Sequence, residues 1–248
     1  MQAHGMTDIG KNRVMNQDYI FYSTTPIGSL PNVFIVADGM GGHKAGDLAS
    51  SYAVEVFLKS VRLLKPGSPI TVIGDAIQEV NREVYAKSKS SADYEGMGTT
   101  FVVAVISGKV LYVANVGDSR LYVIGDTIRQ ITRDHSLVEE MVSMGEIDKK
   151  EARNHEKKNI ITRAIGVGEK IMADFFEVEL SEKEAVLLCS DGLTNMMEES
   201  DIFYIVNRKK ESAKEKVLHL IELANRNGGR DNISAILVEP DGFEVQAC

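Results

Sequence analysis

Five aspartates of this 248-residue chain lie where segments predicted to be β-strands begin or end. Three of the five are next to a glycine, which lets a backbone carbonyl turn toward a ligand without a side chain in the way. Mg²⁺ and Mn²⁺ prefer about six oxygen ligands, chiefly from carboxylates, carbonyls and water. Strand ends that meet at one edge of a sheet would therefore give a site for hard divalent cations. The five residues are Asp18, Asp38, Asp118, Asp191 and Asp231.

Such a site would suit the hydrolysis of phosphoesters. Two divalent cations held roughly 3.5–4 Å apart can place a water between them, lower its pKa and clamp a phosphoryl oxygen. Arg13 precedes the first of the aspartates by a few residues, and its guanidinium could bind two phosphate oxygens at once. Each residue alone has a simpler explanation, because Asp-Gly is common in turns. The residue types by themselves leave both interpretations open.

Most of the chain between these residues is predicted to form antiparallel sheets. Ser107-Gly108 and Gly125-Asp126 each separate two strand-like segments by two residues, which is the pattern of a tight hairpin. Short turns of this kind connect antiparallel neighbours. The alternation of apolar and polar residues predicts strands over residues 18–23, 32–37, 99–106, 109–116, 120–124, 127–131, 170–179, 185–190 and 232–239.

Four segments have an apolar face with helical period instead, over residues 45–61, 70–88, 136–144 and 214–227. Helices and one-sided sheets must both bury an apolar surface. We therefore expect an α+β fold, a four-layer α-β-β-α sandwich in which two antiparallel sheets are flanked by helix pairs. Residues 1–248 are expected to form a single domain. The charged stretch 145–159 is expected to be an exposed excursion from it.

Composition excludes several classes of function. The chain has 28 basic and 36 acidic residues and a net charge of -8, so a nucleic-acid partner is not expected. The longest apolar runs, such as residues 101–106, are too short to span a membrane. Cys189 and Cys248 form no disulfide framework, which fits a reducing compartment. We expect a cytoplasmic protein with no membrane partner.

Six segments, taken in order, resemble the PP2C (PPM) family of metal-dependent protein serine/threonine phosphatases, and most of all its bacterial members. Any one segment is weak evidence, but the ordered set is specific and spans most of the chain. The segments are Thr7-Asp8-Ile9-Gly10-x-x-Arg13-x-x-Asn16-Gln17-Asp18, Val36-Ala37-Asp38-Gly39-Met40-Gly41-Gly42-His43, Gly98-Thr99-Thr100, Asn115-Val116-Gly117-Asp118-Ser119-Arg120, Ser190-Asp191-Gly192-Leu193 and Gly229-Arg230-Asp231-Asn232-Ile233-Ser234.

The resemblance implies a central two-sheet sandwich and an activity. Phosphoserine and phosphothreonine would be hydrolysed by direct attack of a water held between two tightly bound Mn²⁺ or Mg²⁺ ions, without a phosphoenzyme. The substrates would be phosphoproteins in signalling, including a cognate serine/threonine kinase, and the enzyme would be a monomer. The excursion at 145–159 would correspond to the flap of the family, a variable segment beside the active site.

The resemblance also implies roles for the acids. Asp38 would bridge the two metal ions, and the Gly39 carbonyl would bind one of them. Asp191 and Asp231 would complete the protein ligands of the other ion. Asp118, together with Asp191, would hold a third ion that binds more weakly.

Four further residues complete the site implied by the resemblance. Arg13 would bind the substrate phosphate, while Asp18 and Asn232 would support the ligands from behind. Many relatives have glutamate in place of Gln17, so a metal–water contact there would be neutral. Animal relatives have a histidine after the bridging Asp-Gly, where this chain has methionine. His43 is then the nearest candidate for a general acid, and capping of the following helix is the alternative.

Four other interpretations of the sequence are less well supported. A catalytically inactive relative would lack metal aspartates, and none is missing. The glycines at 39–42 follow a strand and precede a helix, but they do not have the G-x-G-x-x-G spacing of a dinucleotide site. A two-metal nuclease fits poorly with an acidic chain. A cysteine phosphatase needs an arginine six residues after its nucleophile, where Cys189 has Asn195.

Overall fold

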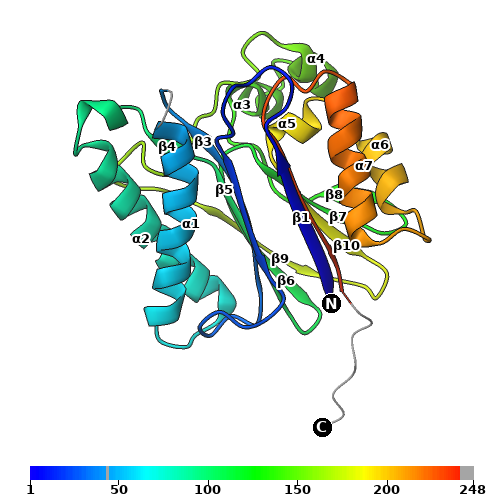
Figure 1. Ribbon diagram of the computed structural model, residues 1–248, viewed down its shortest axis with the longest axis horizontal. Coiled ribbons are helices and arrows are strands. Elements are labelled where there is room, and N and C mark those ends of the chain that lie inside the picture. The colour runs from blue at the N-terminus through cyan, green and yellow to red at the C-terminus, as the bar shows by residue number, and fades with distance from the viewer. Residues whose placement is uncertain (43–44, 241–248) are drawn as a thin grey trace.

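The computed structural model describes residues 1–42 and 45–240, and two antiparallel sheets packed face to face form its centre (Figure 1). The first sheet consists, in spatial order, of β1 (Gln2–Asp8), β11 (Ile233–Glu239), β10 (Ala185–Cys189), β7 (Arg120–Ile124) and β8 (Ile128–Gln130). The second consists of β2 (Asp18–Ser23), β3 (Val33–Met40), β5 (Phe101–Ser107), β6 (Val110–Val116) and β9 (Asp174–Glu179), with β4 (Gly98–Thr99) paired to β3.

Helices cover the outer faces of both sheets (Figure 1). On one side α1 (Ala45–Leu63) and α2 (Pro69–Ser88) pack on the second sheet, and on the other α6 (Glu199–Val206) and α7 (Ala213–Arg226) pack on the first. The expected four-layer α-β-β-α sandwich is thus confirmed. Shorter elements are η1 (Ala92–Tyr94), α3 (Leu137–Ser143), α4 (Lys149–Asn154) and α5 (Asp191–Thr194).

The layers follow from the alternation of side chains along each strand. In β3, Ile35 belongs to the apolar core beneath α1 and α2, while Phe34 and Val36 belong to the core between the two sheets. Successive side chains of a strand point to opposite faces, so a strand covered on both faces is apolar throughout. The interior of the sandwich is therefore filled on both sides of each sheet, and polar side chains collect at the ends of the strands.

Several sequence predictions differ from the structure in their boundaries. β3 does not stop before Asp38, as expected, but continues to Met40, because Gly39 and Met40 pair with β4. The strand expected over 170–179 begins only at Asp174. β1, α4, α5 and α6 were not predicted. The sequence of α6 includes Phe203-Tyr204-Ile205-Val206, and aromatic and β-branched residues of this kind favour strands.

The excursion expected at 145–159 is part of a longer segment, which we call the flap (residues 136–161). Its two ends are joined by the bridge between Ser136 and Ile161 and by a hydrogen bond from the Leu137 amide to the Ile160 carbonyl. It contains α3 and α4, and α4 has no buried residue. Neither residues 1–42 nor residues 45–240 include a helix long and apolar enough to span a bilayer.

Candidate active site

The strands bring all five predicted aspartates to one end of the sandwich. Asp18 opens β2 and lies directly opposite Asp38 of β3 in the antiparallel register. Asp118 follows β6, Asp191 is the first residue of α5 after β10, and Asp231 precedes β11. The carboxyl group of Asp38 is close enough to the other four to be repelled by each of them. The sheet edge predicted from the sequence is therefore a single acid cluster.

Burial and mutual repulsion make this cluster costly to ionise in the protein chain alone. Burial, then repulsion by the neighbouring aspartates, raises the pKa of Asp38 and of Asp118 well above the ordinary carboxyl value. Burial likewise raises the pKa of Asp18 to about 7 and of Asp191 to about 6. A bound cation would remove this cost, because an opposite charge nearby favours the ionised form.

Two buried carboxylate oxygens in the cluster have no hydrogen-bond donor among the described residues, Oδ1 of Asp18 and Oδ1 of Asp191. The other oxygen of each is bound: the Ser190 hydroxyl donates to Asp18 Oδ2 at 2.7 Å, and the Asn195 amide donates to Asp191 Oδ2 at 2.9 Å. Buried polar atoms are normally paired, and an exception calls for an explanation such as an ion. Oxygens that are held on one side and free on the other fit a divalent cation.

The acids surround a shared space but do not form a closed cage. Within residues 1–42 and 45–240, no group of three or more histidine, cysteine, aspartate or glutamate side chains is arranged as a complete ligand set. Mg²⁺ sites commonly use one or two carboxylates and fill the remaining positions with water and substrate oxygens. The arrangement therefore suits ions that keep exchangeable ligands better than it suits a structural metal.

Two threonines fix the backbone of Asp38. Neither was predicted from the sequence to have a role at the site. The Asp38 amide donates to Thr100 Oγ1 at 2.9 Å, and Thr99 Oγ1 donates to the Asp38 carbonyl at 2.9 Å. Thr100 Oγ1 also lies 2.8 Å from Ser119 Oγ, next to Asp118. Small polar residues that open an apolar strand are a signal, since buried hydroxyl groups need partners. The pair links the Asp38 strand to the Asp118 turn.

Arg13 lies beside the acids, half-exposed. Its Nη2 donates to Asp231 Oδ2 at 2.8 Å, and its pKa is raised chiefly by that hydrogen bond. Asp38 and Asp191 add to this through their charges. From the sequence alone, Arg13 could also be a surface residue with no role at the site. Its position beside three of the acids favours a role at the site instead. The remaining guanidinium donors are available to an anion above the cluster.

Asn232 is buried and holds the loop that carries Arg13. Its Oδ1 accepts from the Gln17 amide at 2.8 Å, and its Nδ2 donates to the carbonyls of Ile9 and Met15 at 2.9 and 3.0 Å. These bonds join the last strand to a loop more than 210 residues away in the sequence. Asn232 therefore supports the site, as predicted, by fixing the position of the loop that carries Arg13.

The segment after Asp38 packs tightly on the start of α1. A Cβ at Gly39 would collide with the carbonyl oxygen of Gly46, so the position accepts only glycine. A Cβ at Gly46 would in turn collide with the side-chain amide of Gln17. Gln17 thus lies against the first turn of α1. His43, the candidate general acid, lies outside the described residues.

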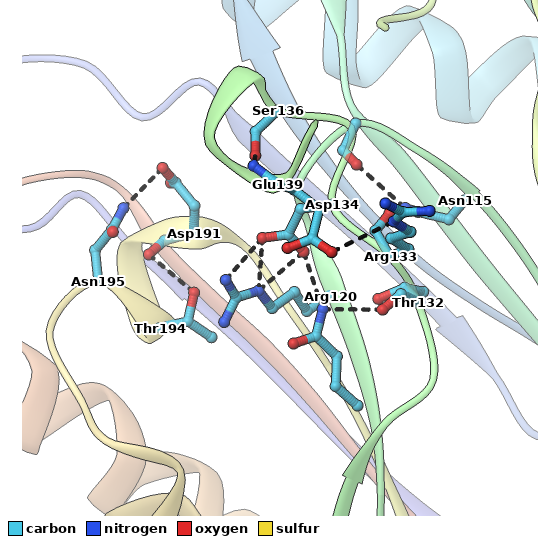
Figure 2. Close-up of polar contacts among 12 residues, drawn as sticks. Asn115, Arg120, Thr132, Arg133, Asp134, Ser136, Glu139, Asp191, Thr194 and Asn195 are labelled. Carbon is cyan, nitrogen blue, oxygen red and sulfur yellow. Dashed lines mark hydrogen bonds and ion pairs between the residues drawn. The ribbon is translucent and has the colours of Figure 1, made fainter. Parts of the chain in front are cut away.

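A cavity of about 440 Å³ extends from the acids to the flap. Asp118 and Asp191 line it on one side, and residues of α4, including Arg153, line the other. Figure 2 shows Asp191 with Asn195 at one edge and the pair formed by Arg120 and Asp134 at another. The lining contains acidic and basic groups together. A polar ligand with both kinds of partner, such as a peptide segment, matches it better than an apolar molecule does.

Comparisons with known proteins agree with this fold. The sequence model of the protein phosphatase 2C family matches residues 8–237. The serine/threonine phosphatase stp of Listeria monocytogenes is 43% identical over 248 residues, covering 97% of this chain and 96% of that protein. The crystal structure of the serine/threonine phosphatase Stp1 from Staphylococcus aureus has a TM-score of 0.90 at 32% identity, covering 97% of this chain and 95% of that one.

A third comparison concerns metals. The catalytic domain of the serine/threonine protein phosphatase PstP, solved in complex with two manganese ions, has a TM-score of 0.82 at 30% identity. The match covers 95% of this chain and 96% of that one. The class indicated by the fold and these comparisons is therefore that of the protein serine/threonine phosphatases. The chain belongs to the protein phosphatase 2C family, as the six sequence segments predicted.

Proposed function

We propose that this protein hydrolyses phosphoserine and phosphothreonine in proteins, and that it does so with divalent metal ions. The observation that carries the proposal is the acid cluster itself. Burial raises the pKa of Asp18 to about 7 and of Asp191 to about 6, and each has a buried oxygen without a partner in the described chain. An arginine lies at the rim of the same cluster. Carboxylates that need cations, next to a donor for phosphate, suit phosphoester hydrolysis.

Two tightly bound Mn²⁺ or Mg²⁺ ions would activate the attacking water and neutralise charge on the phosphoryl oxygens. Asp38 would contact both ions, the Gly39 carbonyl one of them, and Asp191 and Asp231 the other. Asp118 would share a weaker third ion with Asp191. The fit rests on the unpaired Asp191 oxygen and on the raised pKa values of Asp38 and Asp118.

The remaining steps depend on residues of the chain. Arg13 would bind and orient the phosphate with guanidinium donors not used by Asp231, and its loop would stay in place through Asn232. Asp18 would keep its position behind Asp38 through the Ser190 hydroxyl. His43 is proposed as the group that returns a proton to the leaving oxygen.

The setting is proposed on the same basis. Relatives such as the Listeria monocytogenes enzyme carry the name serine/threonine phosphatase, which supports phosphoproteins as substrates. A signalling role, with a cognate kinase among the substrates, is part of the proposal. We further propose that residues 1–248 act as one domain and one monomer in the cytoplasm, and the net charge of -8 supports the absence of a nucleic-acid partner.

The test is phosphate release from phosphoserine and phosphothreonine peptides by the purified protein. EDTA should abolish it, and Mn²⁺ or Mg²⁺ should restore it. Asp38→Asn should retain less than about a tenth of the wild-type kcat at saturating Mn²⁺ while remaining folded, because the bridging anion is lost. Asp126→Asn, in an exposed turn, is the control and should match the wild type. Wild-type turnover by Asp38→Asn would refute the bridging role, and a metal-loaded wild type without activity would point to an inactive relative.

A further inference from the structure

His135 lies outside the acid cluster, yet it contacts the turn that carries Asp118. Its side chain is 4% exposed. The His135 amide donates to the Gly117 carbonyl at 3.0 Å, and His135 Nδ1 accepts from the Gly117 amide at 3.1 Å. One residue therefore binds both backbone groups of Gly117, and the next residue in the chain is Asp118.

The other ring nitrogen of His135 faces the second sheet. Nε2 lies 3.1 Å from Oδ2 of Asp174, the first residue of β9, and Arg163 Nη1 donates to Asp174 Oδ1 at 2.9 Å. Burial lowers the pKa of His135, with Arg163 acting in the same direction and Asp174 and Asp134 opposing it. A neutral ring that accepts at Nδ1 carries its proton on Nε2, which donates to Asp174. Nδ1 thus faces the Gly117 amide, and Nε2 faces Asp174 with Arg163 Nη1 3.3 Å away.

Gly117 has little freedom to move away from this contact. Its φ of +105° is strongly unfavourable for a residue with a side chain, and a Cβ there would lie 2.6 Å from the Thr100 side chain. Asn115 Nδ2 also donates to the Gly117 carbonyl at 3.1 Å. The direction of the Asp118 side chain is therefore set by a turn that is held from several sides, and His135 is the only one of these contacts that also reaches the flap.

His135 lies at the base of the flap: it directly precedes the first flap residue and is hydrogen-bonded to the residue after the last one. The His135 carbonyl accepts from the Thr162 amide at 2.8 Å, next to the bridge between Ser136 and Ile161. Arg163, which binds Asp174, is the next residue after Thr162. A displacement of the flap base would consequently act on His135, and through the Gly117 amide on Asp118.

We propose that His135 is a positioning residue that couples the base of the flap to Asp118 and thereby sets the affinity of the weakly held third cation. The inference rests on the proposed function and deepens it. Within the described residues no hydrogen bond joins His135 to Asp38, Asp191 or Asp231, so the ions of the tight pair should not depend on it. A histidine that only filled space would instead affect overall stability.

The first measurement is hydrogen exchange of the Gly117 amide by NMR in metal-free protein. His135→Leu removes the acceptor at Nδ1, and loss of one buried hydrogen bond should speed exchange by about tenfold. His135→Asn is the matched variant, because its Oδ1 stands at the position of Nδ1 and can accept the same proton. It should keep exchange within about threefold of the wild type. His219→Leu removes a half-exposed histidine on α7 and is the control.

The second measurement is calorimetric titration with Mn²⁺, together with the Mn²⁺ dependence of kcat. His135→Leu should weaken the low-affinity phase by about tenfold and leave the tight phase and KM unchanged, and His135→Asn should restore it. Unaltered weak binding in His135→Leu overturns the proposal, and so does equal loss of both phases. A wild type that shows both binding phases but releases no phosphate would instead contradict the proposed function, with the coupling still decided by the titrations.

Discussion

The two segments that border the acid cluster are held in different ways. The Arg13 loop (residues 9–17) is bound by the buried side chain of Asn232 at three backbone positions, and the Gly229 carbonyl accepts from Lys11 and Asn12. The flap is joined at its base, and its helix α4 reaches the core chiefly through Arg153. One border is fixed by the buried side chain of Asn232 just before β11, and the other depends on a partly exposed arginine of α4.

This difference suggests a division of tasks. A phosphate has the same shape in every substrate, so a rigid arginine loop suits it. Phosphoproteins differ around the modified residue, and a segment with few buried contacts can adapt to them, since local stability follows buried contacts. Changes in the Arg13 loop should thus affect all substrates alike, whereas changes in the flap should depend on the substrate.

The largest effect is expected from the fixed border. Arg13→Ala removes a charged contact worth roughly 1.5–3 kcal/mol, which raises KM about ten- to hundredfold for peptides and for p-nitrophenyl phosphate alike. To the extent that the contact strengthens in the transition state, the loss falls on kcat instead. Steady-state kinetics with both substrates check this, and Arg13→Lys tests whether charge without the planar fork is enough. Unchanged kinetics would show that Arg13 is a surface residue that does not bind the phosphate.

Asp118 should give an intermediate effect. Asp118→Asn should leave tight metal binding intact and lower kcat by about tenfold, without full rescue by millimolar Mn²⁺, because an ion held by few protein oxygens binds weakly. Calorimetry beside kinetics separates the outcomes. Loss of tight binding would show that Asp118 is a ligand of the two tightly bound ions. Wild-type binding and turnover would show that it only stabilises the turn and has no catalytic role.

Metal-free protein should show a pH dependence that metal removes. The pKa of Asp18 is raised to about 7 and that of Asp191 to about 6, above the unfolded value, so between about pH 4 and pH 7 the folded chain binds more protons than the unfolded chain. Its free energy of unfolding therefore falls as pH rises through this window. Thermal midpoints in EDTA should decrease from about pH 5 to pH 8, and Mn²⁺ should reverse the trend. Asp18→Asn should flatten the profile, and a rise with pH would contradict the account.

The smallest effect is expected at the adaptable border. Arg153 Nη2 donates to the Met197 carbonyl at 2.6 Å and its guanidinium pairs with Glu198. Arg153→Ala should raise KM for a phosphoprotein by about two- to fivefold and leave p-nitrophenyl phosphate unaffected, since partly exposed contacts are worth little. Asn154→Ala on the same helix is the control. Equal effects on both substrates would show that the flap, like the Arg13 loop, does not distinguish between substrates.

The fold and the acids were accessible from the sequence because both are local patterns. The apolar run of β3, the helical period of α1 and the aspartates at strand ends are visible within a few residues. The short helix α6 was missed, since its aromatic and β-branched residues favour strand and only packing on the first sheet makes it a helix.

The supporting contacts were not accessible, because they join residues far apart in the chain. Asn232 binds the Gln17 amide across 215 positions, and Ser190 binds Asp18 across 172. The family resemblance predicted that Asn232 supports the metal ligands, but it did not predict which backbone groups Asn232 binds. His135 was not singled out at all, since a histidine after an aspartate has no local pattern that indicates a buried contact with Gly117.

Cys189 ends β10 only two residues before Asp191 and is fully buried. Burial raises the pKa of its thiol to about 12, so almost none of it is thiolate at neutral pH. Peroxide and alkylating reagents attack the thiolate, and they meet no nucleophilic sulfur at this position. A phosphatase built on carboxylates above such a cysteine would continue to work under oxidative stress that inactivates enzymes whose nucleophile is a thiolate.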